Sequence, residues 1–126
     1  MKNIIITTII IFSTVLAASA QTNKSIEGIW ENNTKKMKVE IYKEDNKFFG
    51  KVVWLSDKSN EEIRLGDVII KDLEFEKTEV IYNDGTFVWG GNKLKCAIKP
   101  LEGERIKIML SKLVYSREMY WTKTRI

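Results

Sequence analysis

Charged and apolar side chains alternate strictly along one stretch of the chain, Lys36-Met37-Lys38-Val39-Glu40-Ile41. A period of two places the apolar side chains on one face of a β-strand and the charged ones on the other. Glu44-Asp45-Asn46-Lys47 then offers a natural hairpin turn, and the run Phe48 to Leu55 that follows is rich in aromatic and β-branched residues. Together these segments predict a β-hairpin with one face in the core.

The same pattern continues along the rest of the chain. Further strands are predicted at Val68–Phe75, Thr78–Tyr82, Phe87–Trp89, Leu94–Lys99, Arg105–Leu110 and Leu113–Thr124. Asn83-Asp84-Gly85 gives a strong turn signal, because these residues tolerate the positive φ of a tight hairpin. Only Ser56–Gly66, polar and acidic, is long enough for a longer loop. The sequence therefore predicts an all-β fold, an antiparallel up-and-down meander barrel of about eight strands.

The first twenty residues have the three-part pattern of a secretory signal peptide. Lys2 supplies a positive start, an apolar run extends from Ile4 to Ala17, and Ala18-Ser19-Ala20 offers small residues to a signal peptidase. The run is shorter than the ~20 residues of a membrane-spanning helix, which favours cleavage after Ala20 over a retained anchor. We expect an exported protein, periplasmic or secreted, with residues 21–126 as a single β-barrel domain and no stable membrane span after cleavage.

Composition narrows the chemistry that this domain can perform. The chain has 21 Lys and Arg against 17 Asp and Glu, a mixed surface that predicts no nucleic-acid partner. It has no histidine and one cysteine, which predicts no histidine-dependent nucleophile, no metal site and no disulfide. Cys96 shares a strand face with Leu94 and Ile98 and is interpreted as a small buried hydrophobe. We expect no enzyme, no catalytic residue and no cofactor.

Three acidic residues, Glu74, Glu76 and Glu79, cluster near one predicted hairpin. A carboxylate pair can hydrolyse glycosides or bind calcium. The favoured interpretation is an exposed polar face matched by Lys71 and Lys77, because nothing in the spacing indicates a site.

Short motifs run through the chain in a fixed order: Gly28-Ile29-Trp30, Val39-Glu40-Ile41-Tyr42, Gly50 to Leu55, Gly66 before an apolar strand, and Tyr120-Trp121-Thr122-Lys123. From Ile26 to Thr124 this order resembles the DUF2147 family of exported bacterial proteins, a domain of unknown function. The Gly28-x-Trp30 start, with a basic residue on the last strand, also resembles the calycin signature of lipocalins and their relatives. The second resemblance implies a barrel in which Trp30 plugs the closed end and a late Arg or Lys covers its ring.

The last strand offers two cations for that plug. Arg117, Trp121 and Lys123 share one parity, which predicts an inner face together with Leu113, Tyr115 and Met119. A cation over an indole ring stabilises by ~0.5–2 kcal/mol. We assign the plug to Gly28, Trp30, Arg117 and Lys123, with Arg117 as the preferred cation. Alternatively, Lys123 is bound by solvent and Arg117 pairs with a surface carboxylate.

Four tryptophans are many for so short a chain. A barrel of about eight strands has an interior just wide enough for side chains, or for one small ligand. One hypothesis is a non-enzymatic module that binds a small apolar or amphipathic ligand in the barrel mouth, with contacts from Trp54, Trp89, Tyr115 and Trp121. The alternative is a filled barrel that acts through its surface, as an envelope protein–protein interaction module or an enzyme inhibitor.

Overall fold

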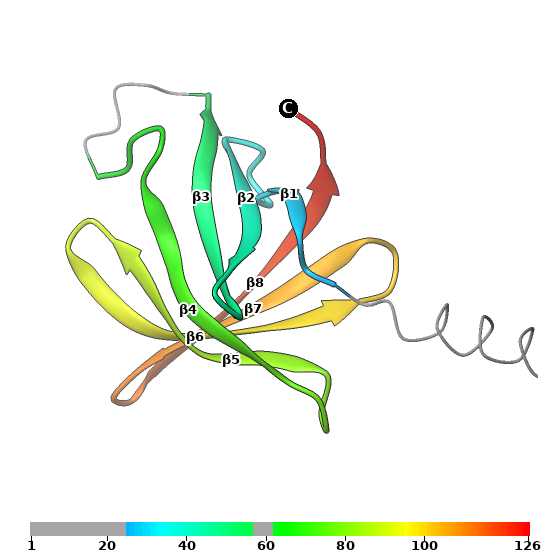
Figure 1. Cartoon of the computed structure of the whole chain (residues 1–126). Coiled ribbons are helices and arrows are strands. Elements are labelled where there is room, and N and C mark those ends of the chain that lie inside the picture. The colour runs from blue at the N-terminus through cyan, green and yellow to red at the C-terminus, as the bar shows by residue number, and fades with distance from the viewer. Residues whose placement is uncertain (1–24, 57–61) are drawn as a thin grey trace, which may run out of the picture.

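The computed structural model describes residues 25–56 and 62–126, and in these residues eight antiparallel strands form a closed barrel (Figure 1). The strands are β1 Gly28–Glu31, β2 Met37–Glu44, β3 Lys47–Leu55, β4 Val68–Glu76, β5 Ile81–Trp89, β6 Asn92–Leu101, β7 Arg105–Lys112 and β8 Tyr115–Thr124. Each strand pairs with the next, and β8 pairs back with β1. The predicted up-and-down meander barrel is therefore confirmed.

The segment expected to be a signal peptide, with its cleavage point after Ala20, lies outside the described residues. Within residues 25–56 and 62–126, no helix combines the length and the apolar character needed to cross a membrane.

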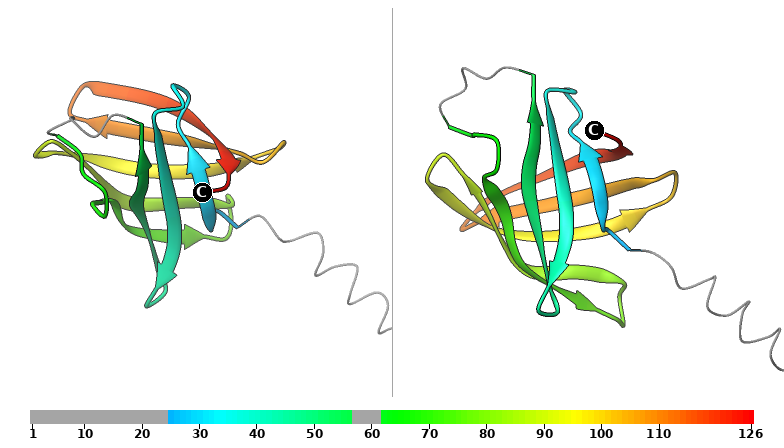
Figure 2. Two further views of the ribbon diagram at one scale, coloured as in Figure 1. Left: turned by 90° about the horizontal axis from the view of Figure 1, so that it is seen from above. Right: turned by 45° about the horizontal axis from the view of Figure 1, so that its top comes forward.

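The barrel has a single core, enclosed by two groups of strands. Figure 2 shows β1, β2 and β3 running across the direction of β5 to β8. Met37, Val39 and Ile41 point into the core from β2, as their period of two predicts. The β2–β3 turn is the expected one, because Asp45 and Asn46 take φ values of +52° and +66°. The hairpin that decides the fold is confirmed.

The turn predicted at Asn83-Asp84-Gly85 was wrong. Thr78–Tyr82 and Phe87–Trp89 were expected to be separate strands, but Ile81–Trp89 forms one continuous strand, β5. Asp84 has a φ of +62°, and the register with β6 shifts between Tyr82 and Gly85. The left-handed residue therefore makes a bulge inside a strand, which bends the chain without reversing it.

Trp30 lies at one end of the barrel. Its exposed fraction is 3%, and its Nε1–H donates to the backbone carbonyl of Ile26 at 2.8 Å. Lys123 pairs with Trp30 across the β1–β8 ladder and places its Nζ 5.6 Å from the centroid of the indole ring. Gly28 makes room for this lysine, because a Cβ at that position would lie 2.9 Å from Lys123 Cε. These three residues make the contacts that the predicted plug requires, and their role in closing the barrel stays a prediction.

Arg117, the preferred cation for the plug, does not take part in it. It lies six residues before Lys123 on β8, about 20 Å along an extended strand. It pairs with Leu110 and is exposed near the opposite end of the barrel. Parity placed both cations on one face, but the β1–β8 register decides which of them reaches Trp30.

Replacing Trp30 by Ala should lower the free energy of unfolding by ~3–5 kcal/mol, the range for deleting a large buried aromatic side chain. Lys123→Met should lower it by ~0.5–1 kcal/mol, the range for an exposed cation over a ring, because the charge is lost while the aliphatic stem is kept. Urea unfolding measures both values. Arg117→Met is the matched control, expected to change stability by less than about 0.5 kcal/mol. A larger effect of Arg117→Met than of Lys123→Met would contradict the assignment.

Candidate ligand cavity at the barrel mouth

A cavity of about 720 Å³ opens at the end of the barrel opposite Trp30. The connections β1–β2, β5–β6 and β7–β8 meet there, and residues of each connection or of the strand ends beside it line the cavity. The wall is mainly apolar and aromatic, with Met37, Phe87, Trp89, Leu94, Met119 and Trp121. The cluster of buried apolar side chains includes Trp30 and also Met37, Phe87, Leu110 and Trp121 of the cavity wall. The hydrophobic core therefore extends from Trp30 to the wall of the cavity.

Three of the four predicted ligand contacts line this cavity: Trp89, Tyr115 and Trp121. Trp89 stacks on Phe87 with the ring planes 5° apart and the centroids separated by 6.1 Å. Trp121 has an exposed fraction of 1% and lies deep in the wall, whereas Tyr115 is half exposed at the rim. These three contacts could be predicted from two features of the sequence, the period of two along the strands and the aromatic nature of the residues.

Trp54, the fourth predicted contact, lies outside the lining of the cavity. Lys38 pairs with Trp54 and Val39 pairs with Val52, so that Val53 is an extra residue on β3. This bulge reverses the parity expected from Val52 and turns Trp54 to the outer face. There the Nζ of Lys38 lies 5.2 Å from the centroid of the Trp54 indole ring. The assignment of Trp54 to the ligand site is corrected accordingly.

Three polar groups belong to residues that line the cavity: the indole N–H of Trp121 and the cationic groups of Arg117 and Lys112. The Nε1–H of Trp121 is buried and has no hydrogen-bond acceptor among the described residues. A buried donor without an acceptor costs about 1–3 kcal/mol, so an acceptor from a ligand would be favourable there. Arg117 lines the same cavity as an exposed cation, and Lys112 joins it at the rim. The wall thus offers one buried donor and two positive charges beside apolar surface.

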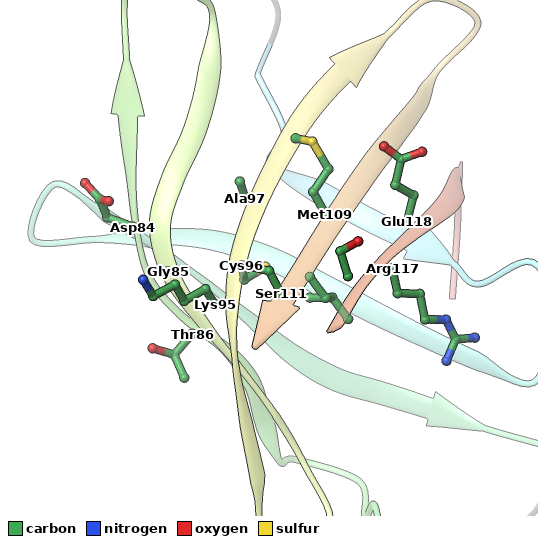
Figure 3. Close-up of a pocket in the computed structure, with 12 residues that line it drawn as sticks. Asp84, Gly85, Thr86, Lys95, Cys96, Ala97, Met109, Ser111, Arg117 and Glu118 are labelled. Atoms are coloured by element: carbon green, nitrogen blue, oxygen red, sulfur yellow. The ribbon is translucent and has the colours of Figure 1, made fainter. Parts of the chain in front are cut away.

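A second hollow, of about 730 Å³, lies over strands β5 to β8. Figure 3 shows the acidic side chains of Asp84 and Glu118 on opposite sides of it, with Cys96, Ala97 and Ser111 between them. Glu118 is engaged by Lys107 at 3.7 Å and by the hydroxyl of Tyr120 at 3.4 Å. Because charges of both signs surround small side chains and no apolar enclosure forms, we favour the mouth cavity as the ligand site.

The acidic cluster of the β4–β5 hairpin has a structural role at Glu76. Its carboxylate accepts hydrogen bonds from the backbone N–H of Glu79 at 2.9 Å and of Thr78 at 3.2 Å. These bonds, that of Glu79 first, lower the pKa of Glu76. Among the described residues, no group of three or more His, Cys, Asp or Glu side chains is arranged to hold a metal ion.

Comparison with known proteins supports the fold. No family model and no curated protein matches the chain, so the resemblance to DUF2147 stays a prediction. Among solved structures, the barrel is similar to protein HP1028 from the human pathogen Helicobacter pylori, which belongs to the lipocalin family. The TM-score is 0.63 at 15% sequence identity, over 80% of this chain and 84% of that chain. At this identity the likeness concerns the fold, and the chain has a lipocalin-like barrel.

The thiol of Cys96 should be inert in the folded protein. Burial raises its pKa from 9.0 to about 12, and the thiolate is the reactive form. A thiol reagent should therefore label the native protein slowly at mildly alkaline pH and label the protein in concentrated guanidinium chloride at once.

The raised pKa of Cys96 also makes the stability of the folded protein depend on pH. The unfolded thiol ionises near pH 9.0 and the folded one near 12, so the stability from this group is fully present below pH 9.0 and is lost as the pH rises toward about 12. Urea midpoints should fall over this interval more steeply for the parent chain than for Cys96→Ala. Equal slopes, or rapid labelling of the native protein, would contradict burial of the thiol.

Proposed function

We propose that this protein is a non-enzymatic binding module that holds one small amphipathic ligand in the cavity at the barrel mouth. The observation that carries the proposal is the cavity itself, because it lies inside a barrel that is plugged at its other end. Its volume of about 720 Å³ falls within the usual range for small-molecule sites, and its wall is apolar with few polar groups. A lipocalin-like fold is compatible with this role.

The polar groups of the wall suggest the chemistry of the ligand. Its apolar part would pack against Phe87, Leu94 and Met119. An oxygen acceptor would satisfy the Nε1–H of Trp121, and an anionic group would lie near Arg117 at the mouth. Guanidinium groups bind carboxylates and phosphates through paired hydrogen bonds. These features favour an amphiphile with a negatively charged head over a purely apolar molecule.

The setting of this function is also a proposal. The pattern of residues 1–20 supports export, with cleavage after Ala20 and a periplasmic or secreted domain. The alternative of an envelope interaction module or an enzyme inhibitor assumed a filled barrel. The hollow mouth favours ligand binding over that alternative.

A fluorescence titration with 8-anilinonaphthalene-1-sulfonate, an anionic amphiphile, tests the proposal. We expect saturable binding to the parent chain. Trp121→Phe removes the buried N–H but keeps an aromatic side chain, and Arg117→Gln removes the charge. Each should weaken binding about tenfold, the scale of one hydrogen bond to a charged group. Trp54→Phe is the matched control on the outer face and should bind as the parent does.

Two results would overturn the assignment of the ligand site. One is the absence of saturable binding, and the other is an equal loss in Trp54→Phe and Trp121→Phe. Native mass spectrometry of the protein purified gently from its own host adds an independent readout. We expect a bound mass that is lost on denaturation and is reduced in Trp121→Phe.

A further inference from the structure

The β7–β8 turn carries two fully exposed apolar side chains at the rim of the cavity. The exposed fractions of Leu113 and Val114 are 98% and 103%, and both residues line the mouth. In Figure 1 this orange turn and the yellow β5–β6 turn project from the same side of the barrel. Leu113 was expected on the inner face of the last strand, but β8 begins at Tyr115, so Leu113 lies in the turn.

The backbone of this turn favours other residues. Leu113 has a φ of +54°, and a two-residue hairpin with a positive φ at its first position favours glycine there. The β5–β6 turn follows such a preference with Gly90 and Gly91, and the β2–β3 turn uses Asp45 and Asn46. Only β7–β8, among the two-residue turns described, places a large apolar residue, Leu113, at a position with a positive φ. Leu113 and Val114 are not buried, and a leucine at a positive φ strains the backbone. Their presence in this turn therefore indicates contact with something outside the chain.

The rim around the turn is basic. The segments 32–36, 89–95 and 111–117 contain six cations and no acidic residue: Lys35, Lys36, Lys93, Lys95, Lys112 and Arg117. The β3–β4 connection lies at the same end and adds Glu62, Arg64 and Asp67 among its described residues, with the Glu62 carboxylate beside Gly90, so basic residues still outnumber acidic ones at the mouth. At the plugged end, acidic residues outnumber basic ones in each turn, namely 44–47, 76–80 and 101–105. Charge is thus graded along the barrel axis, with the positive end at the mouth. A surface that attracts this end must be negative.

We propose that the rim of the mouth is a docking surface for an anionic lipid bilayer, with Leu113 and Val114 inserted among the acyl chains. Lys112, Lys93 and Arg117 would contact the lipid phosphates, and Tyr115 would lie at the level of the headgroups, where tyrosine is enriched. A protein partner would need about 800 Å² of the surface, far more than a two-residue tip provides. A bilayer accepts a small tip, because the tip needs no complementary pocket.

This inference goes beyond the proposed function and does not need a ligand in the cavity. The two can fail separately, since the titration with 8-anilinonaphthalene-1-sulfonate uses no lipid. If both hold, the mouth faces the bilayer, and an amphiphile can pass between membrane and cavity with its apolar part shielded from water.

A fluorophore attached at single positions tests the orientation. Val114→Cys is labelled with an environment-sensitive dye, and Thr78→Cys in the β4–β5 turn is the control at the plugged end. Cys96 does not compete for the dye, because it is buried. We expect the emission of the Val114 label to shift to the blue when phosphatidylglycerol vesicles are added. Pure phosphatidylcholine vesicles or high salt should weaken the shift, because both remove the electrostatic attraction.

A vesicle flotation assay tests the apolar contribution of the tip. Leu113→Gly combined with Val114→Ser restores the residue that the backbone favours, so the double variant should unfold at the same urea concentration as the parent or a higher one. It should bind phosphatidylglycerol vesicles at least about tenfold more weakly. Val80→Ser is the matched control: Val80 is also an exposed apolar turn residue with a positive φ, at the plugged end. It should bind vesicles as the parent does.

Three outcomes would overturn the proposal. The first is a response of the Thr78 label that equals or exceeds that of the Val114 label, since the plugged end would then approach the bilayer. The second is unchanged vesicle binding by the stable double variant. The third is sedimentation of the parent chain as a dimer that the double variant does not form, because the tip would then be an interface between two copies.

Discussion

Closure of the sheet through the pairing of β1 with β8 is the constraint on which the other features depend. β1 is only four residues long, yet it pairs with β2 on one side and with Thr122–Thr124 of β8 on the other, and so closes the sheet into a barrel. The same pairing sets Trp30 opposite Lys123. It therefore decides which end of the barrel is plugged and, by exclusion, which end can admit a ligand.

Side chains that point inward could be predicted wherever the strands run without irregularity. Met37, Val39 and Ile41 follow from a period of two, and the barrel follows from the repetition of that period with short turns. Bulges limit this approach, because one extra residue moves every later side chain to the opposite face. Trp54 was misplaced for this reason. A bulge depends on how a strand fits its partner, so it is not encoded in the strand's own alternation.

Periodicity also could not predict how far along the barrel axis each side chain lies. Arg117 and Lys123 share a parity, and only the register of β8 against β1 distinguishes the plug from the mouth. The position of the cavity has the same origin. Isoleucine side chains make up much of the buried core, while the wall of the cavity carries the stacked Trp89 and the buried Trp121. The number of tryptophans in the sequence shows how many large rings the barrel must place. Whether a cavity remains between these rings depends on where each strand begins, which the count does not give.

The β1–β8 pairing also has a consequence for the order in which the molecule is assembled. β1 is the first strand and β8 the last, so the ladder between them cannot form until β8 has been synthesised. Until then, β1 and β7 are open edges, and Trp30 lacks its lysine. Such non-local pairing slows folding, because a long loop must close before the contact contributes. A barrel of this topology can therefore close only after β8 has been made, so the plug and the mouth form together at the last step of closure.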